Sequence, residues 1–335
     1  MPALKLGFFT RVLDHAPAPE RYRMALDQII HAERLGFDTA WIAQHHFHEA
    51  EGGLPAPLVF LAHAAARTSR IRLATGIITL PLELPVRVAE DSAVLDMLAG
   101  GRLEVGVGPG GNHSAFAAFG LDPASRIALM TSHLALIKRA WGGGELPGGD
   151  RLYPASPGLA DRVWQATFTV EGGHRAGAEG DGLLLSRTQP RPEGNPRATI
   201  ADIQAPILDA YYAALPPGRA PRVLASRSVF VADDRAEALR LAEAGLRRAR
   251  ARLGLGTGGT LAEWITAANS HVGTPNEVID SLAADATLQR ATELAVQVHS
   301  IDPPHALTLR SLELMAERVA PALGWAGPST VAKAA

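Results

Sequence analysis

Short apolar runs alternate with longer amphipathic segments along almost the whole chain, and this alternation limits the possible folds more than any other feature of the sequence. The short runs are typical of buried β-strands, and the longer segments carry apolar residues at helical spacing. Strands that alternate with helices form parallel sheets with right-handed connections. The predicted strands are Leu4–Phe9, Thr39–Ala43, Ile71–Thr79, Leu103–Val107, Val163–Phe168, Leu183–Ser186, Arg222–Val231 and Leu294–Ser300.

A predicted helix follows each of these strands. Eight such units close into a (β/α)8 barrel, also called a TIM barrel. An open doubly wound sheet is the alternative, and the eighth unit near the C-terminus favours the barrel. We therefore expect an α/β fold in which residues 1–325 form a single barrel domain and residues 326–335 form a disordered tail. The predicted helices are Glu20–Leu35, Leu58–Thr68, Val86–Leu98, Ile127–Trp141, Gly172–Ala178, Ile200–Leu215, Ala236–Leu253 and Ala306–Ala320.

Three stretches interrupt the alternation. Gly142–Leu159 and Thr188–Ala198 are rich in Gly and Pro, and Gly254–Gly259 precedes two extra predicted helices, Leu261–Ala268 and Pro275–Ala284. In a barrel enzyme, insertions at the C-terminal ends of the strands shape or cover the pocket. An ordinary solvent-exposed loop is the alternative for each. We expect Thr188–Ala198 to be mobile without ligand and to cover the pocket when ligand is bound.

The composition argues against several classes of protein. Lys and Arg number 32 against 34 Asp and Glu, so the net charge is not that of a nucleic-acid-binding protein. The absence of Cys excludes disulfides, thiolate metal ligands and a cysteine nucleophile. We identify no apolar stretch of membrane-spanning length and no secretory signal, and we expect a cytoplasmic enzyme that does not bind membranes.

The segment Gln44–His48 contains three histidines and directly follows the second predicted strand. In a barrel, this position lies at the catalytic end. Because histidine titrates near neutral pH, His45 is a candidate acid or base in the pocket. A packed, hydrogen-bonded structural histidine is the alternative. The segment has no HExxH motif and no nearby acid at ligand spacing, so we predict no metal site.

A glycine-rich segment, Gly106–Asn112, follows the fourth predicted strand. Its spacing resembles a dinucleotide-binding fingerprint, but that fingerprint belongs to the first turn of a Rossmann unit, and Pro109 interrupts it. Glycines permit a close approach of the backbone to a flat or anionic ligand. Gly108, Gly110 and Asn112 are therefore candidate ligand contacts, and a simple tight turn is the alternative.

The sequence TVEGGHR, which begins at Thr169, lies between the fifth predicted strand and its helix. Free N–H groups at the start of a helix bind anions, and Gly172 and Gly173 would allow close contact. Arg175 adds positive charge, whereas Glu171 would repel a phosphate unless its side chain turns away. A helix cap explains Thr169 equally well.

Polar residues are spaced two apart in the last two predicted strands. Ser226 and Ser228 share one face of their strand, and Gln297 and His299 share one face of theirs. In a barrel this face is the lumen or the pocket, and a face toward the helices is the alternative. The chain has no Gly-x-Ser-x-Gly elbow and no Ser–His–Asp order, which disfavours hydrolase chemistry.

Together these segments resemble the bacterial-luciferase-like flavin-dependent monooxygenases. Gly36–Phe47 (GFDTAWIAQHHF) is similar to the family's Gly-Phe-Asp…Trp…Glu-His-His-Phe segment. Ala74–Gly110 is similar to its most characteristic block, which ends in Leu-Asp-x-x-Ser-x-Gly-Arg-x-x-x-Gly. Gly173–Ser186 and His271–Leu282 are similar to later motifs. The resemblance extends from Leu4 to Gly324 and is closest to an FMN-type subgroup of unknown substrate.

The resemblance implies a barrel with an inserted lid and a flavin bound at the C-terminal rim. It implies an enzyme that uses reduced FMN and O2, through a flavin peroxide, to oxidise a small organic substrate. A separate flavin reductase would supply the reduced FMN. Two alternatives stay open, namely hydride transfer with a deazaflavin and a catalytically silent flavin-binding protein. A homodimer is usual for the family.

The resemblance also assigns roles by position. His45 corresponds to the first histidine of the family's His-His pair, which is catalytic in bacterial luciferase. Gly76 and Ile77 fall where the family has a non-prolyl cis peptide against the flavin ring. Thr169 and Glu171–Gly173 match the phosphate-binding helix start. The expected cofactor-binding residues are Gly76, Ile77, Gly108, Gly110, Asn112, Gln165, Thr169, Glu171, Gly172 and Gly173.

Two departures from the family pattern bear on the ligands. Pro109 replaces a phosphate-contacting arginine, and Arg175 or Arg11 is the candidate substitute for that charge. Ser226 and Ser228 occupy the place where alkanesulfonate monooxygenases carry an Arg-x-His pair, which argues against a sulfonate substrate.

Overall fold

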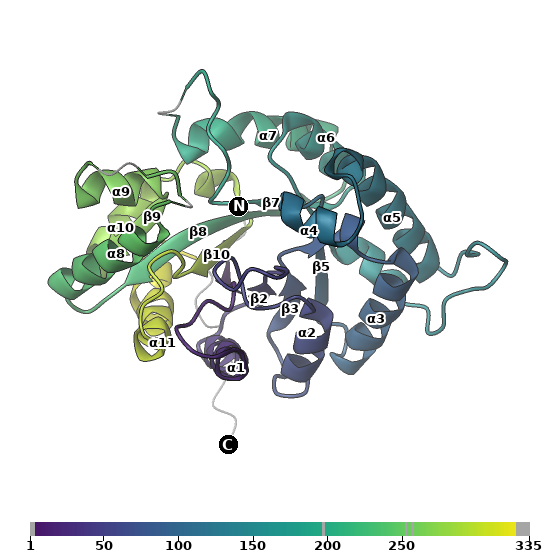
Figure 1. The fold of residues 1–335 in the computed structure, drawn as a ribbon, viewed down its shortest axis with the longest axis horizontal. Coiled ribbons are helices and arrows are strands. Elements are labelled where there is room, and N and C mark those ends of the chain that lie inside the picture. Colours follow the sequence, from purple (N-terminus) through teal and green to yellow (C-terminus); the bar gives the residue numbers. More distant parts are fainter. Residues whose placement is uncertain (1–3, 196–197, 252, 256–257, 326–335) are drawn as a thin grey trace.

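Eight parallel strands close into a barrel, as the sequence predicts (Figure 1). The computed structural model describes residues 4–195, 198–251, 253–255 and 258–325. The barrel strands run in the order β1-β2-β3-β5-β6-β7-β8-β10, and β10 closes the ring by pairing with both β8 and β1. The strands are β1 Lys5–Thr10, β2 Thr39–Ile42, β3 Arg72–Thr75, β4 Ile78–Thr79, β5 Leu103–Gly108, β6 Val163–Ala166, β7 Gly182–Leu185, β8 Val223–Val231, β9 Ser270–Gly273 and β10 Glu293–Gln297.

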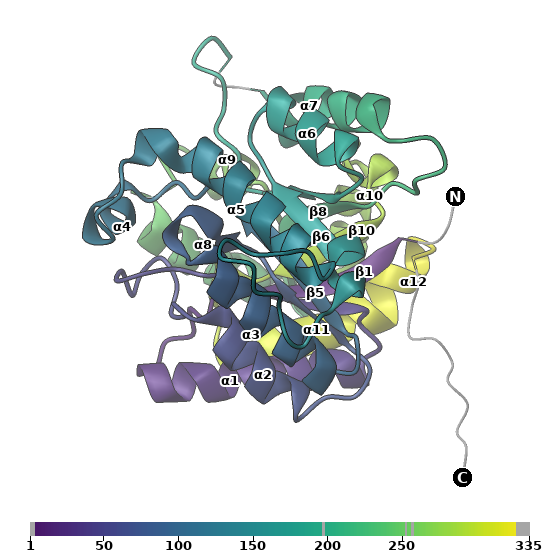
Figure 2. The same ribbon diagram turned by 90° about the vertical axis from the view of Figure 1, so that its right-hand side faces the viewer.

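Helices surround the barrel and connect its strands (Figures 1 and 2). Several begin with proline in the first turn, where the missing N–H has no intrahelical partner to lose. The helices are α1 Ala18–Arg34, α2 Pro57–Ala65, α3 Pro85–Leu98, α4 His113–Ala118, α5 Arg126–Trp141, α6 Val170–Ala178, α7 Ile200–Ala214, α8 Arg235–Ala249, α9 Leu261–Ala267, α10 Pro275–Ala283, α11 His305–Leu314 and α12 Ala320–Ala322, with a π-helical turn at Met315–Val319 and short 3-10 turns at Leu80–Leu82, Pro123–Ser125, Pro157–Arg162 and Leu288–Arg290.

Four elements differ from the sequence-based expectation. The predicted strand Ile71–Thr79 is divided into β3 and β4 by a cis peptide bond between Gly76 and Ile77. The last predicted strand ends at Gln297 instead of Ser300. Helix α4 was not predicted, and neither was β9, which pairs with the C-terminal half of the nine-residue strand β8. Both are short, and the pattern of four residues in β9 is too brief to show a strand period.

The lumen of the barrel is filled with side chains. An inward-facing apolar cluster contains Trp41, Ala74, Trp164, Leu184, Leu224 and Ala295. The rings of Trp41 and Trp164 meet edge to face with centroids 5.4 Å apart. Because this layer blocks the lumen, a ligand has access only to the ends of the barrel.

The C-terminal end of the barrel carries the inserted elements. Figure 2 shows α4 and α9 on the side opposite the N-terminus and α12. The segment in which we expect a disordered tail, residues 326–335, lies outside the described residues, as do parts of the Thr188–Ala198 and Gly254–Gly259 stretches. No helix in the described ranges combines the length and the apolar character needed to cross a bilayer.

Candidate active site

His45 lies just beyond β2, at the C-terminal end of the barrel. Its backbone N–H donates to the carbonyl of Leu54 at 3.0 Å, which holds the segment after β2 against the loop that follows it. The loop also packs on the imidazole, because a Cβ added at Gly52 would lie 2.5 Å from His45 Cδ2. Glycine at position 52 therefore leaves the space that the ring fills.

The His45 imidazole is neutral near pH 7. Burial, the nearby positive charge of Arg11, and His299 and His46 together lower its pKa to about 3. A neutral imidazole has one donor and one acceptor nitrogen, so His45 can take up a proton or orient a polar group.

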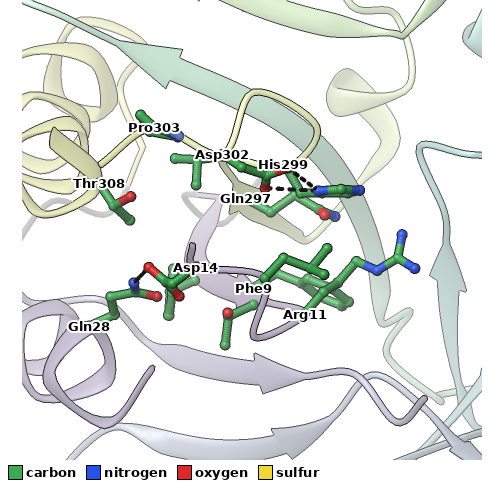
Figure 3. A pocket seen from close by; sticks show the side chains of 13 residues that line it. Phe9, Arg11, Asp14, Gln28, Gln297, His299, Asp302, Pro303 and Thr308 are labelled. Carbon is green, nitrogen blue, oxygen red and sulfur yellow. Dashed lines mark hydrogen bonds and ion pairs between the residues drawn. The ribbon is translucent and has the colours of Figure 1, made fainter. Parts of the chain in front are cut away.

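A second histidine, His299, lies beyond the end of β10 near the same opening (Figure 3). Its Nδ1 is 2.8 Å from Asp302 Oδ1 and 2.9 Å from Asp302 Oδ2. The pKa of His299 is lowered to about 4, chiefly by burial and also by Arg187 and Arg11, and the hydrogen bond and charge of Asp302 oppose the shift. Two neutral histidines and two arginines thus gather at this end of the barrel.

The predicted contacts Gly76, Ile77, Gly108 and Gly110 do come together. A Cβ at Gly108 would lie 2.4 Å from Ile77 Cδ1, and one at Gly76 would lie 2.7 Å from the ring of Phe9. Gly110 has a φ of 71°, which disfavours other residues. Packing therefore requires these glycines, and the same packing leaves the Gly76–Ile77 peptide half-buried at the opening of the barrel.

Asn112 makes structural contacts at the rim. Its Oδ1 caps α4 by accepting the N–H of Ser114 at 3.0 Å and that of Ala115 at 3.4 Å. Its Nδ2 donates to Glu51 Oε2 at 2.8 Å, which ties the start of α4 to the loop after His45. The Asn112 side chain thus helps to set the shape of the opening.

The start of α6 has the geometry of a helix cap. The hydroxyl of Thr169 accepts the N–H of Gly172 at 3.1 Å. A Cβ at Gly172 would lie 1.9 Å from Thr167 Oγ1, and one at Gly173 would lie 2.6 Å from the carbonyl oxygen of Ile207 in α7. These glycines are therefore required by helix packing. Thr169 and Glu171 are exposed. Because Thr169 accepts the N–H groups of Gly172 and Gly173, the N–H groups of Val170 and Glu171 are those of the first turn that can receive an anion.

Gln165 and Arg175 face the helices and not the lumen. Gln165 Nε2 donates to Asp181 Oδ2 at 2.8 Å and to Glu179 Oε2 at 3.1 Å, and Arg175 Nε donates to Gln165 Oε1 at 3.1 Å. The neighbours of Gln165 in β6, Trp164 and Ala166, belong to the lumen cluster, so alternation turns Gln165 outward. The side chain of Gln165 is thus held in this network and away from the lumen. The same network holds the guanidinium of Arg175, which was a candidate to replace the charge of the arginine that Pro109 displaces.

Some buried polar atoms near the opening have no hydrogen-bond partner in the described part of the chain. Ser228 Oγ and Gln297 Oε1 are two of them. Gln297 Nε2 donates to Ser226 Oγ at 2.8 Å, so Gln297 bonds across the lumen face through its nitrogen only. A buried acceptor or hydroxyl without a partner is costly unless a ligand or water supplies one.

Sequence reasoning missed three residues near this end of the barrel. They are Phe9, whose ring packs against Gly76, Asp302, which contacts His299, and Asp14, which lies near His305. The sequence contains a partial signal for the first two. Phe9 and Arg11, at the end of β1 and just beyond it, are two residues apart and so share the lumen side, and Asp302 follows His299 by three residues. Among the described residues, no three His, Asp or Glu side chains are grouped so as to hold a metal ion.

Comparison with known proteins assigns this chain to a family. The model of the family described as luciferase-like monooxygenase matches residues 5–292. The crystal structure of the monooxygenase RslO1 from Streptomyces bottropensis has a TM-score of 0.79 and 25% identity, covering 96% of this chain and 100% of that one.

Two other proteins differ in their cofactor. The oxygenating constituent of 3,6-diketocamphane monooxygenase from Pseudomonas putida, solved in complex with FMN, shares the fold with a TM-score of 0.77 and 21% identity over 98% of this chain and 100% of that one. An F420-dependent glucose-6-phosphate dehydrogenase from Kineococcus radiotolerans is 34% identical over 143 residues, which is 41% of each chain.

Proposed function

Because this chain belongs to the luciferase-like monooxygenase family, we propose that it is a flavin-dependent monooxygenase that uses reduced FMN and O2 to oxidise a small organic substrate. The observation that carries the proposal is that three features suited to a flavin lie together at the C-terminal end of the barrel. Neutral His45, the glycine-lined Gly76–Ile77 peptide and the start of α6 lie at this end.

The residues present fit a flavin. The backbone at Gly76 and Gly108 carries no side chain of its own and is flanked by the apolar Phe9 and Ile77, and Gln297 Oε1 is a buried acceptor that a ring N–H would satisfy. The N–H groups at the start of α6, with Thr169, would receive the phosphate. Reduced FMN supplies the electrons that activate O2 for transfer of one oxygen atom to the substrate.

The chain's own residues would do three things around the flavin. The glycine turns would hold the ring, the packed lumen beneath it would exclude water, and His45 would hold or move a proton at one imidazole nitrogen. Because the pKa of His45 is about 3, its neutral form is present throughout the range from pH 5 to 8. We expect no inflection from His45 in the pH profile of kcat/KM over that range.

A stopped-flow experiment tests the proposed function. The anaerobic protein is mixed with reduced FMN and then with oxygenated buffer, and the absorbance spectrum is followed beside that of free reduced FMN. A monooxygenase should hold the bound flavin in a transient state that outlasts the oxidation of the free flavin. Binding with the kinetics of free flavin, in the presence of candidate substrates as well, would instead indicate a silent flavin-binding protein.

His45→Ala tests the proposed proton-transfer residue. We expect the dissociation constant for FMN to change by less than about twofold, while turnover falls by about 100-fold or more, the usual contribution of a general acid or base. His48→Ala is the matched control, since His48 is exposed and its Nε2 contacts only Ser114 Oγ, at 2.8 Å. Equal turnover of the two variants would remove His45 from the mechanism.

A deazaflavin-dependent hydride-transfer oxidoreductase is the second candidate. The similarity to the F420-dependent dehydrogenase favours it. The two candidates differ in the reduced cofactor that binds, so the titration is repeated with reduced FMN and with reduced F420. Tighter binding of F420, together with turnover in the absence of O2, would replace the monooxygenase proposal.

Three further expectations belong to this proposal. A separate reductase would deliver reduced FMN, and the enzyme would work in the cytoplasm. We also propose a homodimer. Helices α2 and α3, with the residue that precedes α3, expose apolar side chains that a second copy would cover, namely Val59, Leu84, Val94, Met97 and Leu98.

A further inference from the structure

A small cavity lies behind His299, between the barrel wall and helices α1 and α11 (Figure 3). Its volume is about 30 Å³. A single buried water needs roughly 10–15 Å³ of such space, so the cavity has room for about two water molecules. Gln28 of α1 and Thr308 of α11 line it on one side, and Gln297 and His299 line it on the other, so the cavity leads from the open end of the barrel toward the surrounding helices.

The lining of this cavity is rich in groups that accept or donate protons. The carboxylate of Asp302 reaches it from the His299 side, and that of Asp14 reaches it from the α1 side. Asp14 Oδ1 accepts from Gln28 Nε2 at 2.9 Å, and the same nitrogen is 3.1 Å from His305 Nδ1. Two carboxylates on one small polar cavity are the setting in which buried water is ordered.

The contact between His299 and Asp302 fixes the imidazole tautomer. An ionised carboxylate only accepts hydrogen bonds, so His299 Nδ1 carries the hydrogen and Nε2 keeps its lone pair. The charged or titratable groups that face His299 are Asp302 from its own loop, Arg11 beyond β1 and Arg187 beyond β7, and His299 in turn affects His45 beyond β2. The free lone pair thus belongs to a histidine beside the proposed active site.

We propose that His299 and Asp302 form a proton path from the barrel opening to water in this cavity. The inference rests on the proposed function, because it assigns a route for a proton that the monooxygenase reaction releases or consumes. His299 is the group that would meet the reacting molecules, and Asp302 is a positioning residue that acts through it. Asp14 stands at the far side of the cavity.

The proposed transfer conserves protons and needs no electrons. His299 Nε2 takes up one proton at the barrel opening, and the hydrogen on Nδ1 passes to the Asp302 carboxylate. Asp302 then gives its proton to cavity water, which passes it to Asp14 or to solvent. The reverse sequence brings one proton in. Burial raises the pKa of Asp14, although the nearby His305 opposes this shift. The raised pKa favours proton uptake by Asp14.

Two substitutions at position 302 separate positioning from proton transfer. Asp302 has a φ of 49°, a conformation that Asn and Gly both adopt, so neither variant should strain the loop. Asp302→Asn keeps an acceptor for Nδ1–H but cannot carry a proton. Asp302→Gly removes both functions and leaves space for a small carboxylate.

The first measurement is nitrogen-15 NMR of the histidine side chains in the full chain without flavin. The His299 signal is assigned by its loss in His299→Gln. We expect the Nδ1–H tautomer in the wild type and in Asp302→Asn, and a loss of that preference in Asp302→Gly. An Nε2–H tautomer in the wild type would overturn the proposal. This result does not depend on turnover, so it stands apart from the test of the proposed function.

The second measurement is turnover with reduced FMN and its dependence on pH. We expect Asp302→Asn and Asp302→Gly to bind FMN within about twofold of the wild type and to lose about tenfold or more in kcat. Added formate should restore Asp302→Gly and leave Asp302→Asn unchanged, which a merely structural role would not produce. Wild-type kcat and an unchanged pH profile in Asp302→Asn, or no effect of formate on Asp302→Gly, would overturn the proton path.

Discussion

The two ends of the barrel use the same strands in opposite ways. At the N-terminal end, Trp41 Nε1 donates to Glu293 Oε1 at 2.7 Å and Trp164 Nε1 donates to Glu104 Oε2 at 2.7 Å. Arg72 Nε also donates to Glu104, at 2.5 Å. The polar groups of this end, which we call the closed end, thus pair with one another around the indole rings.

At the C-terminal end the corresponding positions are not closed in this way. His45 and His299 are neutral there, and Ser228 Oγ and Gln297 Oε1 are buried without partners among the described residues. Burying a polar group without a partner costs free energy, and such groups gather where a ligand completes them. The paired groups are expected to stabilise the closed end, and the proposed function places the chemistry at the open end.

The largest expected effect is on stability at the closed end. Trp41→Ala should lower the free energy of unfolding by about 3–5 kcal/mol, because it leaves a large cavity and removes the donor to Glu293. Urea denaturation followed by circular dichroism measures the change. His45→Ala, at the open end, should cost less than about 1 kcal/mol in the same assay. Similar losses for both variants would contradict the division of roles.

Glu293 gives the closed end a specific pH dependence. Burial raises its pKa to about 7, although the hydrogen bond from Trp41 opposes this shift. The folded state therefore binds the proton of Glu293 more tightly than the unfolded state does. The stabilising contribution of that proton is complete below about pH 4.5 and is lost as pH rises through 7, a change of about 3 kcal/mol.

Glu293→Gln should remove this dependence, because Gln keeps an acceptor for the Trp41 N–H and does not titrate. The difference in unfolding free energy between variant and wild type should therefore grow in favour of the variant from pH 4.5 to 8. Denaturation curves at several pH values measure it. A difference that stays constant with pH would show that Glu293 does not titrate in this range.

The start of α6 should matter for both folding and ligand binding. Thr169→Ala removes the hydroxyl that accepts from the Gly172 N–H, at a cost of about 1 kcal/mol in stability. If phosphate also binds there, the affinity for FMN should fall by about five- to tenfold, whereas Thr169→Ser should retain it. FMN fluorescence titration distinguishes the two variants, and equal affinities would place the phosphate elsewhere.

The smallest effect on stability is expected away from both ends. Leu98 in α3 is 69% exposed, so Leu98→Glu should change the unfolding free energy by no more than about 0.5 kcal/mol. If α2 and α3 form the dimer contact, the variant should nevertheless sediment as a monomer where the wild type sediments as a dimer. A monomeric wild type, or a dimeric variant, would remove this surface from the proposal.

Much of the fold follows from local patterns in the sequence. Each of the eight predicted strands lies in the barrel, because buried strands and amphipathic helices differ in period. Helix α4 and strand β9 are too short to show a period, so they escaped prediction. The position of His45 also follows, since it directly succeeds a barrel strand.

The rest of the candidate site depends on contacts between distant segments. Asp14 and Asp302 line one cavity although 288 positions separate them, and no local pattern indicates such a pairing. Gln165 shows the converse. Alternation with Trp164 turns its side chain away from the lumen, which the strand period alone could have indicated.

Hydrogen–deuterium exchange with and without reduced FMN tests the central claim most directly, because it examines both ends of the barrel in one experiment. We predict slower exchange at Gly76–Ile77, Gly108–Asn112 and Thr169–Gly173, with no change at Lys5–Gly7 or Glu293–Ala295. Protection confined to the closed end, or no protection at any FMN concentration that saturates related flavoproteins, would contradict the assignment of the open end as a flavin site.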